Sequence, residues 1–126
     1  MNQTPPSAIN FHKQSQVLDV TYSDTTYSMP AEYLRVYSPS AEVRGHGNDE
    51  IKLVPGKQDV KIIDIKPVGY YAVQLTFDDG HDSGLYTWSM LEQLGKEQEA
   101  NWHSYLQRLA AAGESRAPKP LYKKAD

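Results

Sequence analysis

The sequence predicts an α+β fold, in which small antiparallel β-sheets, a hairpin and a meander, pack against a short helix and a longer C-terminal helix. Two observations predict the sheets. β-branched and aromatic residues cluster between polar turns in residues 9–29, and apolar residues alternate strictly in residues 70–77. A third observation predicts the long helix, because apolar residues recur at three- and four-residue spacing in residues 96–113. A chain of 126 residues fits one domain, which we place over residues 8–113.

The first part of the chain reads as a three-stranded meander. Residues 1–7 are polar and rich in proline, and we expect a flexible N-terminal tail there. Strands are predicted over residues 9–11 and 17–22, and a short third strand over residues 27–29, with polar turns between them.

A short helix and a long loop follow the meander. Pro30 suits the start of a helix and Pro39 stops it, so residues 31–37 are predicted to form about two turns. Residues 38–58 are irregular and contain three glycines. A loop of this length in a small domain is often functional. It is broken only by the apolar run at residues 51–54, and its serines could cap a helix beginning at Ala41.

The second half contains a hairpin and the C-terminal helices. Strands over residues 60–67 and 70–77 are joined at Val68-Gly69, and a polar turn covers residues 78–83. A brief helix over residues 88–94 is expected to be interrupted by Gly95.

The long helix is expected to face the core with one stripe of residues and to end at Gly113, and residues 114–126 read as a disordered basic tail. The stripe consists of Trp102, Tyr105, Leu106, Leu109 and Ala110.

Composition narrows the classes of function. Thirteen basic and sixteen acidic residues give a net charge of -3, which argues against nucleic-acid binding and against anionic membranes. The absence of cysteine excludes disulfides, thiolate nucleophiles and cysteine-ligated metal centres. Neither a basic-then-apolar leader nor an apolar run of about 18 residues is present, and we expect a cytoplasmic protein.

The turn at Asp78-Asp79-Gly80-His81-Asp82-Ser83 is the most site-like segment. His81 could ligate a metal, move a proton or stabilise the turn, and one histidine supplies one of about four ligands that zinc needs. The carboxylates do not have the spacing of a calcium loop. A structural role for His81 is the simplest interpretation.

A second histidine, His46, lies in the glycine-containing segment Arg44-Gly45-His46-Gly47. The segment could cover a pocket or contact an anion, but no lysine and serine follow the glycines as in a phosphate-binding loop. No nucleophile-elbow pattern supports serine hydrolysis. The main aromatic residues have strand and helix spacing and are expected in the core. They are Tyr70, Tyr71, Tyr86, Trp88, Trp102 and Tyr105.

Three stretches carry a resemblance to a known family: Leu34-Arg35-Val36-Tyr37-Ser38-Pro39-Ser40-Ala41-Glu42-Val43, Asp79-Gly80-His81-Asp82-Ser83 and Tyr86-Thr87-Trp88. They resemble the N-terminal domain of gamma-butyrobetaine hydroxylase and trimethyllysine hydroxylase. The resemblance covers residues 9–113, and the chain looks like a free-standing bacterial version, a DUF971-like domain of unknown function. Related domains are also fused to Mrp-type ATPases that carry iron–sulfur clusters.

The hydroxylases that the chain resembles carry a zinc site, whose ligands are the cysteines of Cys-Pro-Cys-x-x-Cys and the histidine of Asp-Gly-His. These positions fall on Ser38, Ser40, Val43 and His81 of this chain. Serine is a poor zinc ligand and valine is none, so we expect the zinc site to be lost and no cofactor to be bound. His81 is then expected to hydrogen-bond to Ser38 or Ser40. Binding of another metal, including iron, by His81 with Asp79, Asp82 or His46 stays open.

The resemblance implies an accessory domain, because the catalytic oxygenase domain of the hydroxylases is absent and we expect no enzymatic activity. The expected function is an interaction domain for a protein partner, with an iron–sulfur carrier or an oxygenase as the implied class. The alternative is an iron- or zinc-binding protein associated with iron–sulfur cluster assembly or with 2-oxoglutarate-dependent oxygenases. The expected interaction surface consists of Arg35, Ser38, Ser40, His46, Asp79 and His81.

Overall fold

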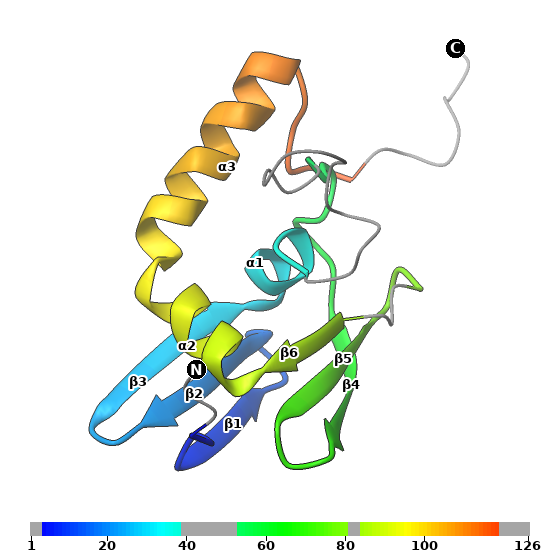
Figure 1. Ribbon diagram of the computed structural model, residues 1–126. Coiled ribbons are helices and arrows are strands. Elements are labelled where there is room, and N and C mark those ends of the chain that lie inside the picture. The colour runs from blue at the N-terminus through cyan, green and yellow to red at the C-terminus, as the bar shows by residue number, and fades with distance from the viewer. Residues whose placement is uncertain (1–3, 39–52, 81–83, 119–126) are drawn as a thin grey trace.

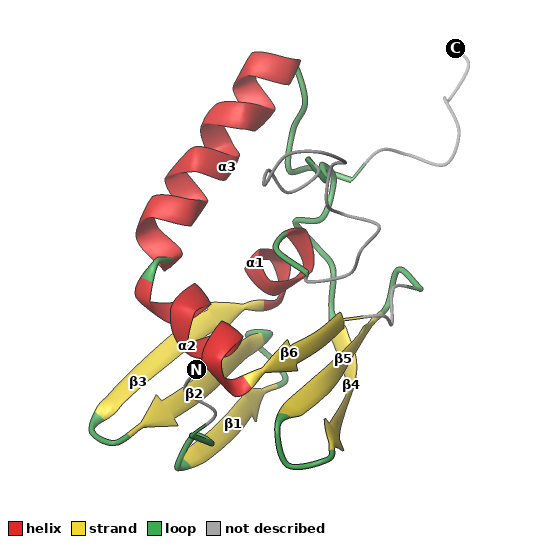
Figure 2. Cartoon of the chain, viewed as in Figure 1, coloured by secondary structure: helices red, strands yellow, loops and turns green. Residues whose placement is uncertain are grey.

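The computed structural model describes residues 4–38, 53–80 and 84–118 of the chain. Within these ranges six strands form two antiparallel sheets, and three helices pack over them (Figures 1 and 2). The elements in chain order are β1 (Ala8–His12), β2 (Val17–Tyr22), β3 (Thr25–Pro30), α1 (Ala31–Val36), β4 (Ile62–Val68), β5 (Ala72–Phe77), β6 (Gly84–Thr87), α2 (Trp88–Lys96) and α3 (Gln98–Ala112). The predicted α+β class is confirmed.

The first sheet is the predicted meander, with strand order β1-β2-β3. Its register places Leu18 opposite Met29, and both side chains are fully buried. Gln16 and Ser23 have positive φ values of 58° and 55° in the two turns. The turns therefore reverse the chain tightly without glycine, and β3 is longer than the predicted third strand.

The second sheet contains the predicted pair β4 and β5 and a third strand, β6. A register shift between Ile62 and Asp64 marks a β-bulge in β4. β6 pairs with β5, with Tyr86 opposite Val73. The sequence analysis missed β6 because its four residues lead directly into α2 and are too few to show alternation.

Helix α2 joins the two sheets. It contacts β6 at its start and β2 and β3 of the first sheet (Figure 1). The Thr87 side chain caps its first turn by accepting a hydrogen bond from the Met90 amide. At the other end, the Tyr33 hydroxyl of α1 donates to the Leu94 carbonyl over 2.7 Å. The two sheets and α2 therefore enclose one main core.

The core forms where these elements meet, and its fully buried large side chains come from both sheets, α1 and α2. They include Leu18, Val20, Met29, Tyr33, Leu34, Leu75, Phe77, Tyr86 and Leu91.

Gly95 lies inside α2 and does not interrupt it, so the predicted break is wrong; the helix ends at Lys96, and Glu97 separates it from α3. A Cβ atom at position 95 would overlap the Cβ and Cγ atoms of Tyr27. The glycine thus allows a close approach between α2 and β3.

The apolar stripe predicted for α3 is narrower in the structure. Tyr105 and Leu109 are buried, Trp102 is half-buried, and Leu106 and Ala110 are exposed. The prediction is wrong for the last two residues. Tyr105 and Leu109 pack with Val36 of α1 in a small second cluster. The buried face of α3 is therefore only about one residue wide along each turn.

The expectation of a core position is also wrong for Tyr70, whose ring is 97% exposed, and for Tyr71, which is exposed to a lesser degree. Both follow Gly69, which has a φ of 55°, in the turn between β4 and β5. It is the carbonyl of Tyr70 that contacts the rest of the chain, because it accepts a 2.7 Å hydrogen bond from the Trp88 indole nitrogen. Tyr86, Trp88 and Tyr105 are buried as predicted.

Residues 114–118, which the sequence analysis assigned to the basic tail, contact the segment that leads into β4. The Gly56 amide donates to the Ser115 carbonyl, and the Gln58 amide donates to the Arg116 carbonyl, each over 3.0 Å. The chain after α3 therefore folds back onto this segment. Within the described part of the chain, every helix is too short or too polar to cross a membrane.

We expect Gly95→Ala to lower the unfolding free energy by about 1–3 kcal/mol, because the new methyl group must displace the Tyr27 ring. An ordinary helical glycine would give the opposite result, since alanine is favoured there by about 1 kcal/mol. Chemical denaturation measures the difference. Repeating the substitution in a Tyr27→Gly background, which removes both overlapping atoms, is the control, and an equal loss there would contradict the proposed overlap.

Candidate functional site

Helix α1 supplies the central residues of the candidate site. All six of its residues are buried, including the charged Glu32 and Arg35. Burial of a charged side chain requires an opposite charge or hydrogen bonds in return. The partners of these two residues come from parts of the chain that are distant in sequence.

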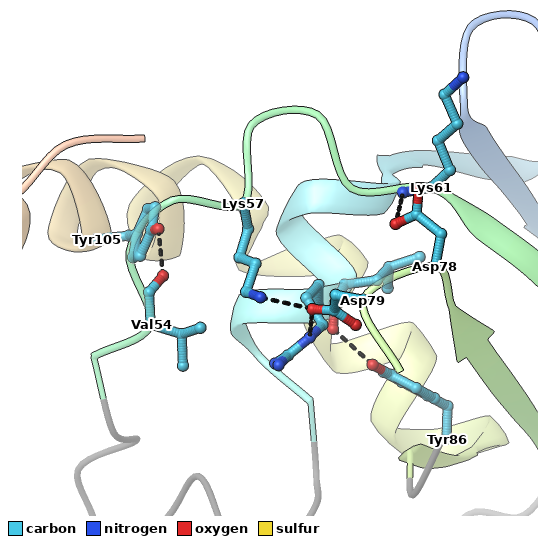
Figure 3. Close-up of polar contacts among 9 residues, drawn as sticks. Val54, Lys57, Lys61, Asp78, Asp79, Tyr86 and Tyr105 are labelled. Carbon is cyan, nitrogen blue, oxygen red and sulfur yellow. Dashed lines mark hydrogen bonds and ion pairs between the residues drawn. The ribbon is translucent and has the colours of Figure 1, made fainter. Parts of the chain in front are cut away.

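Arg35 pairs with Asp79, which lies at the turn after β5. The Arg35 Nε donates to Asp79 Oδ2 over 2.8 Å, and the Lys57 Nζ lies 2.6 Å from the same oxygen (Figure 3). The three side chains are only 11%, 23% and 18% exposed for Arg35, Lys57 and Asp79. We call these three residues the Asp79 cluster. Two cations share one carboxylate oxygen there.

The Arg35 guanidinium is not fully satisfied. Its Nη1 atom is buried and has no hydrogen-bond partner. A buried polar group without a partner costs about 1–3 kcal/mol relative to its hydrated state. The Asp79 cluster therefore holds α1 in place at some cost in stability.

Ser38 lies directly after α1 and is fully buried. Its side chain hydrogen-bonds to the Tyr86 hydroxyl. That hydroxyl also donates a 2.5 Å hydrogen bond to the Leu34 carbonyl at the end of α1 (Figure 3). Burial raises the pKa of Tyr86 well above its usual range, despite the opposing effects of Ser38 and Arg35. The tyrosine stays protonated and joins β6 to α1.

The second charged residue of α1, Glu32, pairs with Arg116. The Arg116 Nε and Nη2 donate to the two carboxylate oxygens of Glu32 over 2.9 and 2.7 Å. The guanidinium also lies 5.3 Å from the Trp102 ring centroid. The hydrogen bonds with Glu32 raise the pKa of Arg116, so the guanidinium remains charged.

Beside the Asp79 cluster lies a small cavity of about 220 Å³, which we call the acidic hollow. Its polar lining consists of Lys57, Asp59, Asp78 and Asp79. Asp78 Oδ1 accepts a 3.0 Å hydrogen bond from the Lys61 backbone amide (Figure 3). Among the described residues, neither Asp59 nor Asp78 forms an ion pair.

The structure brings together three of the predicted site residues. Arg35 and Asp79 form an ion pair, and Ser38 is buried nearby under Tyr86. Ser40, Val43, His46 and His81 lie outside the described residues, as do the predicted helix at Ala41 and the proposed contact of His81 with a serine.

Sequence reasoning missed Lys57 and Arg116. Each lies in an irregular segment, and its partner is 22 or 84 residues away along the chain. An isolated lysine or arginine in a loop gives no periodic signal. The one sequence signal was the pair of charged residues, Glu32 and Arg35, in the short predicted helix.

Of the four positions of the zinc centre that the resemblance implies, only Ser38 lies within the described residues. Ser38, at the first cysteine position, uses its hydroxyl in a buried hydrogen bond with Tyr86. A neutral hydroxyl held in this way is a poor ligand for zinc, which prefers thiolate and imidazole. No group of three or more histidine, aspartate or glutamate side chains suited to a metal ion occurs in the described ranges.

Residues 9–92 match the family model described as gamma-butyrobetaine hydroxylase-like, N-terminal, and the chain belongs to this family. The match covers both sheets and α1, so the resemblance inferred from the motifs is confirmed. No curated protein matches the chain.

Solved structures agree with this assignment. One solution structure determined by NMR is 48% identical, with 98% of each chain covered and a TM-score of 0.81. A second is 43% identical over 100% of this chain and 97% of the other, with a TM-score of 0.77. A crystal structure of a DUF971 protein of unknown function from Acidithiobacillus ferrooxidans is 36% identical, covering 74% of this chain and 94% of the other, with a TM-score of 0.61.

We expect Asp79→Asn to lower the unfolding free energy by about 2–3 kcal/mol, because the neutral amide leaves Arg35 and Lys57 without their shared carboxylate. The matched control is Asp64→Asn. That side chain is 48% exposed and lies 3.7 Å from Lys66, so the change should stay within about 0.5 kcal/mol. Urea denaturation of both variants gives the comparison, and equal small losses would show that the Asp79 cluster is not structural.

Proposed function

We propose that this chain is a non-catalytic accessory domain that binds a protein partner, and that the acidic hollow receives a basic side chain of that partner. One observation carries the proposal: Asp59 and Asp78 line the hollow and have no ion pair within the described residues. Asp79 is already neutralised by Arg35 and Lys57. The hollow therefore presents carboxylates that a lysine or arginine can pair with.

The size of the hollow supports contact with a side chain over binding of a substrate. Its volume of about 220 Å³ is below the roughly 300–1,000 Å³ that is usual for small-molecule sites. Among the described residues of its lining, no nucleophile lies beside a base: the lysine is held in an ion pair, and the other polar groups are carboxylates. These features favour recognition over chemistry.

The family supports an accessory role. Its description refers to the N-terminal part of gamma-butyrobetaine hydroxylase-like proteins, which supports a unit that accompanies a separate catalytic domain. We propose an iron–sulfur carrier or an oxygenase as the partner class, and the cytoplasm as the place where they meet. We further propose that the domain holds its fold without zinc, because Ser38 serves as a hydrogen-bonding residue at a family cysteine position.

Capture from native lysate followed by titration calorimetry with the purified partner tests the proposal. The double variant Asp59→Asn and Asp78→Asn should weaken binding by about tenfold or more, because two carboxylates facing one cation are removed. Asp24→Asn is the control, since Asp24 is exposed in the turn between β2 and β3. Equal affinity of the double variant and the control would contradict a contact at the hollow.

A further inference from the structure

A larger groove lies between the two sheets, on the side where β1 meets the start of β4. Its volume is about 500 Å³, and its lining is mainly apolar. The apolar side chains are Phe11, Ile62, Ile63 and Ile65, and two lysines, Lys13 and Lys61, also line it. We call this the β1–β4 groove. None of its residues belongs to the Asp79 cluster.

Both strands that border the groove are edge strands. β1 is the outer strand of the first sheet and β4 is the outer strand of the second, within the described part of the chain. Edge strands carry backbone groups that point away from their own sheet and are free to pair with another strand. The Ile62 amide is already bonded, because it donates to the Gln16 side-chain oxygen of the β1–β2 turn over 2.8 Å, so an added strand would pair with β4 backbone groups that follow Ile62.

The bulge in β4 exposes an apolar side chain at the same place. The register shift falls between Ile62 and Asp64, and the Ile63 side chain between them is 64% exposed. An exposed isoleucine on an edge strand is a liability for aggregation unless another chain covers it. The groove thus combines an accessible strand edge with apolar surface.

The two lysines give the groove a positive rim. In the described ranges neither Lys13 nor Lys61 forms an ion pair. The Lys61 side chain extends away from Asp78, toward the ribbon of the β1–β2 hairpin (Figure 3). Asp64 is the acidic residue of the lining, and it lies 3.7 Å from Lys66. A ligand with negative charges near its apolar groups complements this arrangement.

We propose that the β1–β4 groove binds an extended peptide segment in which apolar and acidic side chains alternate, and that this segment adds as a strand to the edge of β4. In an extended peptide, successive side chains point to opposite sides. The apolar side chains then contact the isoleucines, and the acidic ones reach the lysine rim. Backbone hydrogen bonds supply affinity and the side chains supply specificity, as in other cases of strand addition.

This second contact rests on the proposed function only in assuming a protein partner, and it is tested without that partner. The probe is a blocked synthetic peptide, Glu-Val-Glu-Ile-Glu-Val-Glu, added to isotope-labelled protein and followed by amide NMR. We expect saturable shifts in β4 and in the β1–β2 turn. A peptide with lysine in place of each glutamate should bind at least tenfold more weakly.

Two matched pairs of variants locate the peptide. Ile63→Glu should weaken binding at least tenfold, whereas Leu85→Glu, at a 40% exposed position on β6 at the opposite edge of the same sheet, should not. Lys13→Glu together with Lys61→Glu should weaken binding by about tenfold, and Lys96→Glu on α2 should not. Ile63→Glu and Leu85→Glu both replace exposed side chains, so we expect both variants to fold.

Three results would overturn the proposal. They are the absence of saturable shifts, equal binding of the acidic and basic peptides, and a dimer of the free protein that Ile63→Glu dissociates. The last would mean that a second copy of this chain covers the groove. Unchanged peptide binding in the double variant of Asp59 and Asp78 separates this test from the test of the acidic hollow.

Discussion

The complete burial of the six-residue helix α1 is the constraint on which the rest of the structure depends. A helix this short is not stable alone, and its two buried charges and its free end groups must be satisfied by other elements. Asp79 forms an ion pair with Arg35, and Arg116 forms one with Glu32. The Tyr86 hydroxyl donates a hydrogen bond to the carbonyl of Leu34. The contacts come from the turn after β5, from the segment after α3 and from β6. Burying one helix therefore fixes the relative positions of three distant parts of the chain.

We propose that this arrangement lets the domain fold without the zinc ligands of the hydroxylases. A structural zinc site joins distant loops by metal bonds. Here an ion pair between Arg35 and Asp79 and the hydrogen bonds of Tyr86 with Leu34 and Ser38 join α1 to the second sheet. The two surfaces that we propose for binding lie next to the start of β4. The acidic hollow and the β1–β4 groove lie on either side of residues 60–61, so one partner could contact both.

Local patterns in the sequence predicted the elements but not the contacts between them. The meander, the β4–β5 pair and the helices followed from alternation, spacing and proline positions, because these depend on nearby residues. β6 was missed because four residues are too few to show the alternation of apolar and polar side chains that identifies a strand. Gly95 was assigned to a break because helix propensity does not reveal that Tyr27 packs against it. For the candidate site, Arg35 and Asp79 were found through the family motifs, whereas Lys57 and Arg116 depend on tertiary contacts that no local pattern records.

The central claim is that ion pairs and hydrogen bonds around α1, and not a metal ion, hold this domain together. The most direct test is elemental analysis of untagged protein, combined with urea denaturation before and after exhaustive chelation. The account predicts folded protein without stoichiometric metal and an unfolding transition that the chelator does not move. Stoichiometric zinc or iron, together with loss of the transition after chelation, would contradict it.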